Sequence, residues 1–147
     1  MWNFFGRVSK VFAAGAFAGL VQSVVLWLLG LAGLFGLLVG EFDFPINLGH
    51  FSQRMVVSGA WAFLFLVPLL RTAPHWRRGL WIGLLRALFT LLLTNPFVDQ
   101  VGFLGLNFGW AWPLIVLFSN LLWGFLAGYW LDKTAEMAFS PPAEQGG

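Results

Sequence analysis

Arg86 carries the chemistry that this sequence must explain first. It lies near the middle of residues 79–95, a segment with no other charged side chain. A guanidinium stays charged, and a charge at the centre of a bilayer costs at least roughly 2.5 to 3.5 kcal/mol. An arginine in such a segment therefore indicates either a functional site or a set of dedicated polar partners.

Other polar side chains recur among small residues at steps of three and four, which places them on one face of each helix. Without water in the hydrocarbon core, these groups must find partners in the protein. We expect a polar intramembrane cluster inside a helical bundle. One alternative is structural, with Arg86 satisfied by neighbouring amides or by lipid phosphate, and the other is a functional site for an anion, a headgroup or a polar substrate. The expected members are Gln22, Arg86, Thr90 and Asn120.

Several classes of chemistry are not expected. The chain has no cysteine, which excludes disulfides, thiolate metal sites and thiol catalysis. Its two histidines, His50 and His75, are predicted on opposite membrane faces, so we expect no metal, haem or other cofactor. We find no nucleophile–base pair, paired intramembrane carboxylates or phosphate loop, and we expect no enzymatic activity. The basic residues form no run of the kind that binds nucleic acid.

The composition predicts the elements that must hold this cluster. The chain is 59% hydrophobic and 10% charged, whereas soluble domains carry about 25% charge. We predict an all-α polytopic membrane protein, with a four-transmembrane-helix bundle in residues 1–133 and a disordered cytoplasmic tail in residues 134–147. The first apolar run would be ~43 Å long as one straight helix, so it should tilt or unwind near its glycines. The predicted membrane-spanning segments are approximately residues 11–39, 51–70, 79–95 and 110–131.

The basic residues predict the orientation. Five of the eight lysines and arginines fall in the N-terminal segment or the second loop, which predicts a bacterial inner-membrane protein with both termini in the cytoplasm. Because helical side chains lean toward the helix N-terminus, Arg86 should lean toward the cytoplasm and snorkel to the headgroups. The arginines of the second loop should bind anionic lipid headgroups. The five basic residues are Arg7, Lys10, Arg71, Arg77 and Arg78.

The opposite face carries the acidic loops. Arg54 lies near the outer start of the second segment and should form an interfacial ion pair with Glu41, Asp43 or Asp99. The glycine-rich loop at residues 101–113 should lie in the outer interface or fold back against the bundle.

Glycines four residues apart predict close helix packing in three of the segments. The pairs also fit a weak parallel repeat, in which the first and second helices correspond to the third and fourth. In that repeat, residues 19–22 match residues 83–86, and residues 51–53 match residues 118–120. The glycine pairs are Gly15–Gly19, Gly79–Gly83 and Gly124–Gly128.

Short motifs between residues 49 and 131 suggest a family. His50 opens the second helix, Arg78-Gly79 begins the third, Pro96 closes it, and the last helix reads NLLWGFLAG. With the glycine-rich outer loop, these features resemble the small four-helix bacterial inner-membrane proteins loosely grouped as YagU-like. In similar sequences the last helix often carries histidine at the position of Asn120 and tyrosine at that of Trp123. The resemblance implies a fold and a membrane location but no established activity.

Three functions fit these predictions. The first is a non-catalytic accessory subunit of a membrane complex, or a homo-oligomer, which the 18% aromatic content and the short loops favour. The alternative is a small-solute or anion transporter or channel that works as an oligomer, with Arg86 favouring anions. The third is a lipid or quinone-like ligand site near Arg86. The expected partners are membrane lipids and other membrane subunits or a second copy, and not nucleic acid.

Overall fold

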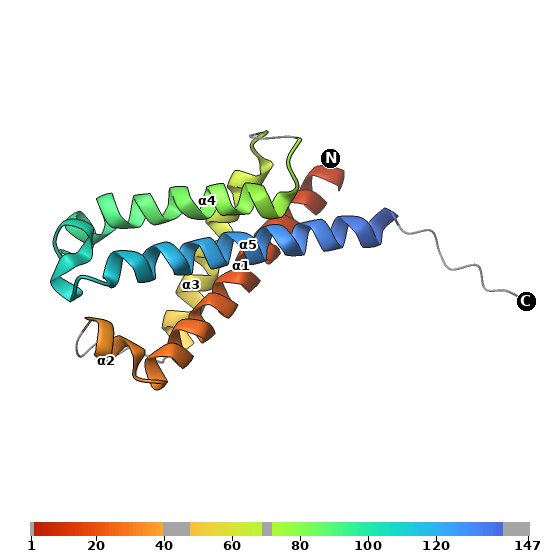
Figure 1. Cartoon of the computed structure of the whole chain (residues 1–147). Helices are drawn as coiled ribbons and strands as arrows, with labels where there is room; N and C mark the ends of the chain where they lie inside the picture. Colours follow the sequence, from red (N-terminus) through yellow and green to blue (C-terminus); the bar gives the residue numbers. More distant parts are fainter. Residues whose placement is uncertain (1, 40–47, 69–71, 140–147) are drawn as a thin grey trace, which may run out of the picture.

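The computed structural model describes residues 2–39, 48–68 and 72–139, and these residues contain helices and no strand (Figure 1). The all-helical fold class is therefore confirmed. Two of the helical elements are 3₁₀ turns and one is a π-helix. In chain order the elements are α1 (Trp2–Leu31), α2 (Leu34–Val39), α3 (Leu48–Ala62), η1 (Phe63–Leu66), α4 (His75–Phe89), η2 (Thr90–Val98), η3 (Phe103–Phe108) and α5 (Trp112–Phe139).

Three helices within the described residues are long and apolar enough to cross a membrane. They are Phe4–Leu31, His75–Val98 and Trp112–Ala135. Three of the four predicted membrane-spanning segments thus correspond to helices of sufficient length and hydropathy, and the fourth stays a prediction. The second predicted segment forms the 15-residue α3 and then narrows into the 3₁₀ turn η1. Its first turns carry polar side chains, including Gln53 and Arg54, which lower its mean hydropathy.

The bundle consists of two antiparallel helical pairs. One pair is α4 with α5, which lie side by side along much of their length in Figure 1, and the other is α1 with α3. The α1/α3 pair runs obliquely across the α4/α5 pair, and α1 contacts α5 where the two pairs meet. We call the end near Leu31 and Val98 the loop end, and the end near His75 and Leu131 the terminal end.

Glycines bring the backbones of α4 and α5 into direct contact. A Cβ added at Gly79 would overlap the Gly124 carbonyl oxygen, and one added at Gly124 would overlap that of Gly79. Gly83 faces the carbonyl of Asn120 in the same way, and Gly128 faces that of His75. The predicted glycine packing is confirmed for this pair, and the seam joins the first half of α4 to the middle of α5.

The α1/α3 pair repeats this seam with different residues. A Cβ at Gly15 would overlap Ala62 and come within 2.6 Å of the Ser58 carbonyl oxygen, and one at Gly19 would meet Ser58 Cβ at 2.5 Å. Ser58 of α3 therefore lies opposite both Gly15 and Gly19 of α1. The parallel repeat predicted from residues 51–53 and 118–120 stays a prediction.

The first apolar run is not one helix. The helix α1 begins at Trp2 and ends at Leu31. Gly33 then has a φ of +77°, a backbone conformation that glycine adopts readily. The short helix α2 follows, and its Phe35 is buried, with two ring atoms 3.2 and 3.4 Å from where a Cβ on Gly30 would lie. The predicted unwinding near the glycines is confirmed.

The third predicted segment continues past its expected end. Pro96 lies inside the π-helix η2 and does not close the helix. Proline has no N–H group to donate within the helix. The wider turn of the π-helix lets the neighbouring carbonyls accept from later amides instead. Asp99 N donates to Thr94 O at 2.9 Å, and Val101 N donates to Asn95 O at 3.0 Å.

The fourth predicted segment also continues, because α5 runs to Phe139, into residues expected to be a disordered tail. The rest of that tail, residues 140–147, lies outside the described residues.

The loop between η2 and α5 folds back against the bundle. This was one of the two alternatives predicted for residues 101–113. Leu104 of η3 packs on a cluster formed by Ala87, Leu91 and Val116. Gly105 is buried there with a positive φ of 75°, and an added Cβ would lie 2.5 Å from Asn95 Nδ2. The loop thus covers the loop end of α4 and α5.

Candidate functional site

A cavity of about 340 Å³ lies in the loop half of the bundle. Residues of α1, α2, α3, α4, η2 and α5 line it, so it occupies the space between the two helical pairs. All four members of the predicted polar cluster are among the lining residues. They are Gln22, Arg86, Thr90 and Asn120.

Arg86 points into the bundle and is only 8% exposed. Its Nη2 donates a hydrogen bond to Ser58 Oγ at 3.1 Å, and its guanidinium carbon lies 4.6 Å from the centroid of the Trp123 ring. Its Nη1 is buried and has no hydrogen-bond partner among the described residues. The expectation that Arg86 would snorkel to the cytoplasmic headgroups is wrong, because the guanidinium turns toward α3 and α5.

Ser58 and Trp123 hold the guanidinium, and both are fully buried. Trp123 Nε1 donates to the Gly15 carbonyl at 3.0 Å, which fixes the indole plane beneath the charge. Ser58 sits against Gly19, where the absence of a side chain leaves room for the hydroxyl. Sequence reasoning missed both residues as site residues, although Ser58 follows the helical spacing of the polar residues in its segment.

The other predicted cluster members divide into two kinds. Thr90 Oγ1 donates to the Arg86 carbonyl at 3.0 Å, and Asn120 Nδ2 donates to the Val116 carbonyl at 2.8 Å, so both turn toward their own helices. Gln22 is 2% exposed, and its Oε1 has no hydrogen-bond partner among the described residues. Asn95, which was not predicted, is also 2% exposed with an unpartnered Nδ2.

Unpartnered buried polar groups are unusual in folded proteins, and each costs roughly 1–3 kcal/mol. Three such groups, on Gln22, Arg86 and Asn95, belong to residues that line this one cavity. Two of the three are donors, so the cavity favours a group that accepts hydrogen bonds.

The charges at the cavity favour the same kind of ligand. Arg54 and Asp99 line it together with Arg86, and Asp99 lies close enough to attract Arg54. Of the acidic partners predicted for Arg54, Glu41 and Asp43 lie outside the described residues. The two guanidiniums also lie close enough to repel each other. Two positive charges and one negative charge leave the described lining with a net positive charge.

The shape of the cavity matches a small ligand. Its volume is near the lower end of the roughly 300–1,000 Å³ that ligand sites occupy. Leu26, Phe35 and Ile115 supply apolar wall, whereas Gln53 and Asp99 are exposed and mark the rim. The cavity can therefore hold an anionic group near Arg86 and an apolar or polar remainder toward the loop end.

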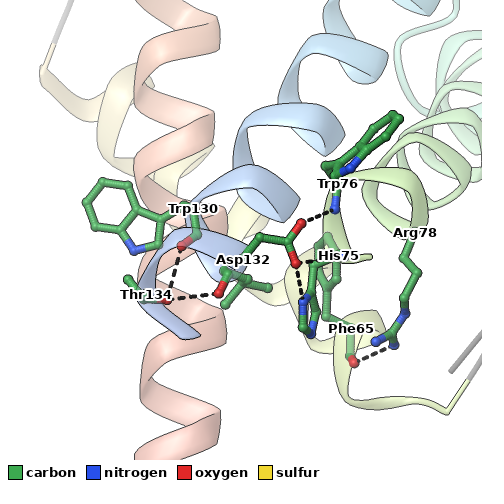
Figure 2. A network of polar contacts seen from close by, with 8 residues as sticks. Phe65, His75, Trp76, Arg78, Trp130, Asp132 and Thr134 are labelled. Carbon is green, nitrogen blue, oxygen red and sulfur yellow. Dashed lines mark hydrogen bonds and ion pairs between the residues drawn. The ribbon is translucent and has the colours of Figure 1, made fainter. Parts of the chain in front are cut away.

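A second polar network lies at the terminal end of the bundle (Figure 2). The Asp132 carboxylate of α5 accepts hydrogen bonds from the backbone N–H groups of His75 and Trp76, both at 3.0 Å, and from His75 Nδ1 at 2.7 Å. A carboxylate at this position satisfies the free amides of the first turn of α4 and complements the helix dipole. Asp132 therefore fixes the end of α5 to the start of α4.

The predicted headgroup arginines have different surroundings. Arg78 Nη2 donates to the carbonyls of Phe65 and Val67 at 2.8 and 2.9 Å, so this arginine closes the end of η1 (Figure 2 draws the first contact). Arg77 is exposed beside the Trp76 ring, with 5.7 Å between the guanidinium carbon and the ring centroid. Arg71 lies outside the described residues. Headgroup binding by these residues stays a prediction.

No protein-family model matches the sequence, and neither a curated protein nor a solved structure matches it. The resemblance to the YagU-like group therefore stays a prediction. Within the described residues, no group of three or more histidine, aspartate or glutamate side chains could hold a metal ion. The chemistry that the described site offers is the recognition of an anion by donors and positive charge.

Proposed function

We propose that this chain is a non-catalytic membrane protein that binds a small anion, or the anionic end of an amphiphile, in the cavity beside Arg86. The observation that carries the proposal is the Nη1 group of Arg86, which is buried in the bundle and unpartnered among the described residues. A charged donor in this position gains more from an anion than from water, because the surrounding dielectric is low.

The proposal includes a fourth membrane crossing. The 15 residues of α3 and the four of η1 together give a length of roughly 30 Å, comparable to the hydrocarbon core. With four crossings, the positive charge near residues 7–10 and 71–78 favours cytoplasmic termini in a bacterial inner membrane. The Arg86 cavity would then open toward the outer side, where Asp99 marks its rim.

The protein would act as an accessory subunit of a membrane complex or as a homo-oligomer. Aromatic side chains remain exposed on the outside of the bundle, among them Trp81, Phe97, Phe118 and Trp130, and these can pack on lipid, quinone or partner helices. Purification in mild detergent should give an assembly larger than the monomer. A strictly monomeric species at every detergent concentration would count against this part of the proposal.

The binding proposal is tested by measuring ligand retention. Protein purified from its native membrane is examined by native mass spectrometry, and inorganic phosphate, acetate and glycerol 3-phosphate are then titrated by calorimetry. Arg86→Gln should lose both the retained anion and the titration signal. Arg77→Gln removes the same charge from an exposed position and should leave both unchanged. Equal binding by wild type and Arg86→Gln would exclude the cavity as the site.

One observation favours transport as a second candidate. Residues at steps of four and five along α4, η2 and the residue after it all line the cavity and form a polar route from mid-bundle to the loop end, namely Arg86, Thr90, Thr94 and Asp99. In the terminal half, however, the glycine seam and a buried apolar cluster around Ala14, Ile82 and Ala127 close the described bundle. Transport would require that seam to part. Anion flux into liposomes that is lost in Arg86→Ala would support transport, and absence of flux in the wild type would exclude it.

A further inference from the structure

A second depression lies at the terminal end of the bundle, away from the Arg86 cavity. It has a volume of about 430 Å³ and is bordered by the first turns of α1, by η1, by the start of α4 and by the last turns of α5. We call it the terminal groove. Three basic side chains line it, Arg7 and Lys10 from α1 and His75 from α4.

The basic side chains are arranged to meet one ligand. Arg7 and Lys10 are three residues apart, so they lie on the same face of α1, and both are exposed. Asp132 occupies Nδ1 of His75, so a ligand in the groove would meet this ring only through Nε2, and the proposed site depends on Arg7 and Lys10 for its charge. The Asp132 carboxylate itself accepts bonds from two backbone amides and this imidazole, so its charge is largely compensated by those donors.

The floor of the groove is apolar. Val11, Phe65 and Leu131 belong to the buried core of the bundle and line the groove from below, and Leu66, 39% exposed, lies beside them. A site for a free inorganic anion needs no such surface. Positive charge above an apolar floor is the pattern that an amphiphile with an anionic head requires.

The groove also lies at the depth of a lipid headgroup. Each of the three membrane-length helices has an end at the groove. His75 begins one of them and Ala135 ends another, and both residues line the groove. Arg7 and Lys10 lie in the first turns of the third, Phe4–Leu31. A phosphate held by Arg7 and Lys10 would let an acyl chain run along Phe65 and Leu66. We propose that the terminal groove binds the phosphate of an anionic phospholipid. This site is separate from the Arg86 cavity and does not depend on anion binding there.

The test compares two double variants of the full chain in nonionic detergent. Native mass spectrometry measures the binding of short-chain phosphatidylglycerol to wild type, to Arg7→Gln/Lys10→Gln and to Arg77→Gln/Lys133→Gln. The control pair removes the same two charges from exposed positions at the same end, and neither residue lines the groove. Because a direct charge-assisted contact with the phosphate contributes roughly fivefold or more to affinity, the groove variant, which loses two such contacts, should bind at least about 25-fold more weakly. The control should change less than threefold, as a rough limit.

Three outcomes would overturn the proposal. Equal losses in the two double variants would show that surface charge acts without a site. Equal binding of phosphatidylcholine and phosphatidylglycerol by the wild type would show that the anionic head is not recognised. Displacement of the lipid by glycerol 3-phosphate at matched concentration would show that the acyl chain contributes nothing, and that the ligand is a free phosphate compound. Far-ultraviolet circular dichroism of each variant verifies that the helices are retained.

Discussion

Replacing Arg86 with methionine separates the structural role of this residue from its role in binding. Methionine retains the length of the aliphatic stem and fills space adaptably, but it removes the charge and all donors. The change therefore removes the hydrogen bond to Ser58 and the contact with the Trp123 ring. It also removes the buried group that has no partner among the described residues.

These effects nearly cancel in the free energy of unfolding. A hydrogen bond from a charged donor contributes roughly 1.5–3 kcal/mol, and a cation–π contact roughly 0.5–2 kcal/mol. Against this loss stands the release of a charge from mid-membrane, worth roughly 2.5–3.5 kcal/mol. Ser58 can then donate to a carbonyl of its own helix, as serines in helices often do. We expect Arg86→Met to change the free energy of unfolding by no more than about 2 kcal/mol.

The assay is unfolding by sodium dodecyl sulfate in mixed micelles, with and without the anion found by calorimetry. At 100 times its dissociation constant, a ligand that binds only the folded protein adds about 2.7 kcal/mol. Wild type should show this gain, and Arg86→Met should show none. Ser58→Ala is the matched variant, because it keeps the charge but removes its hydrogen-bond partner, and it should be destabilising. A loss above about 3 kcal/mol in Arg86→Met, with the ligand effect unchanged, would refute the reasoning and make Arg86 a purely structural residue.

Three further variants test the packing that holds the site. Gly79→Ala should cost about 1–3 kcal/mol, because its Cβ would overlap a carbonyl of α5, whereas Gly6→Ala, in open space on α1, should be neutral or slightly stabilising. Equal effects of these two changes in a denaturant titration would contradict the glycine seam. Asp132→Ala should cost about 1 kcal/mol and speed hydrogen exchange at the first amides of α4, and unchanged exchange there would argue against the cap. Trp123→Phe should lower the free energy of unfolding by about 0.5–1.5 kcal/mol, because the hydrogen bond from the indole N–H is lost. An unchanged free energy in the same denaturant titration would mean that this bond contributes nothing.

The sequence predicted the close contacts of the helices better than their ends. Glycine spacing locates the α4/α5 seam, since only residues without side chains allow backbones to touch. Helix ends follow from tertiary contacts that hydropathy does not encode. Pro96 was expected to stop a helix, but the π-helix η2 accommodates it and the chain continues to Val98. The C-terminal end of α5 was placed at Leu131, although the helix extends to Phe139.

Part of the site could be predicted, but the residues that contact Arg86 could not. Helical spacing brought Gln22 and Arg86 to one cavity, because the polar faces of the helices turn inward together. The observed partner of Arg86 is Ser58, which lies on α3 and was not among the expected members of the cluster. Asn95 was missed because it stood at the predicted end of a helix, whereas the π-helix turns it into the bundle.

The position of the cavity follows from an asymmetry along the bundle. In the terminal half, glycines such as Gly79 and Gly124 let the backbones touch, and no space remains between α4 and α5. Toward the loop end, longer polar side chains such as Arg86 of α4 and Gln22 of α1 lie between the two helical pairs, and Asn95 lies in the π-helix. The cavity is lined by these polar residues, so we expect apolar side chains that fill it to abolish anion binding.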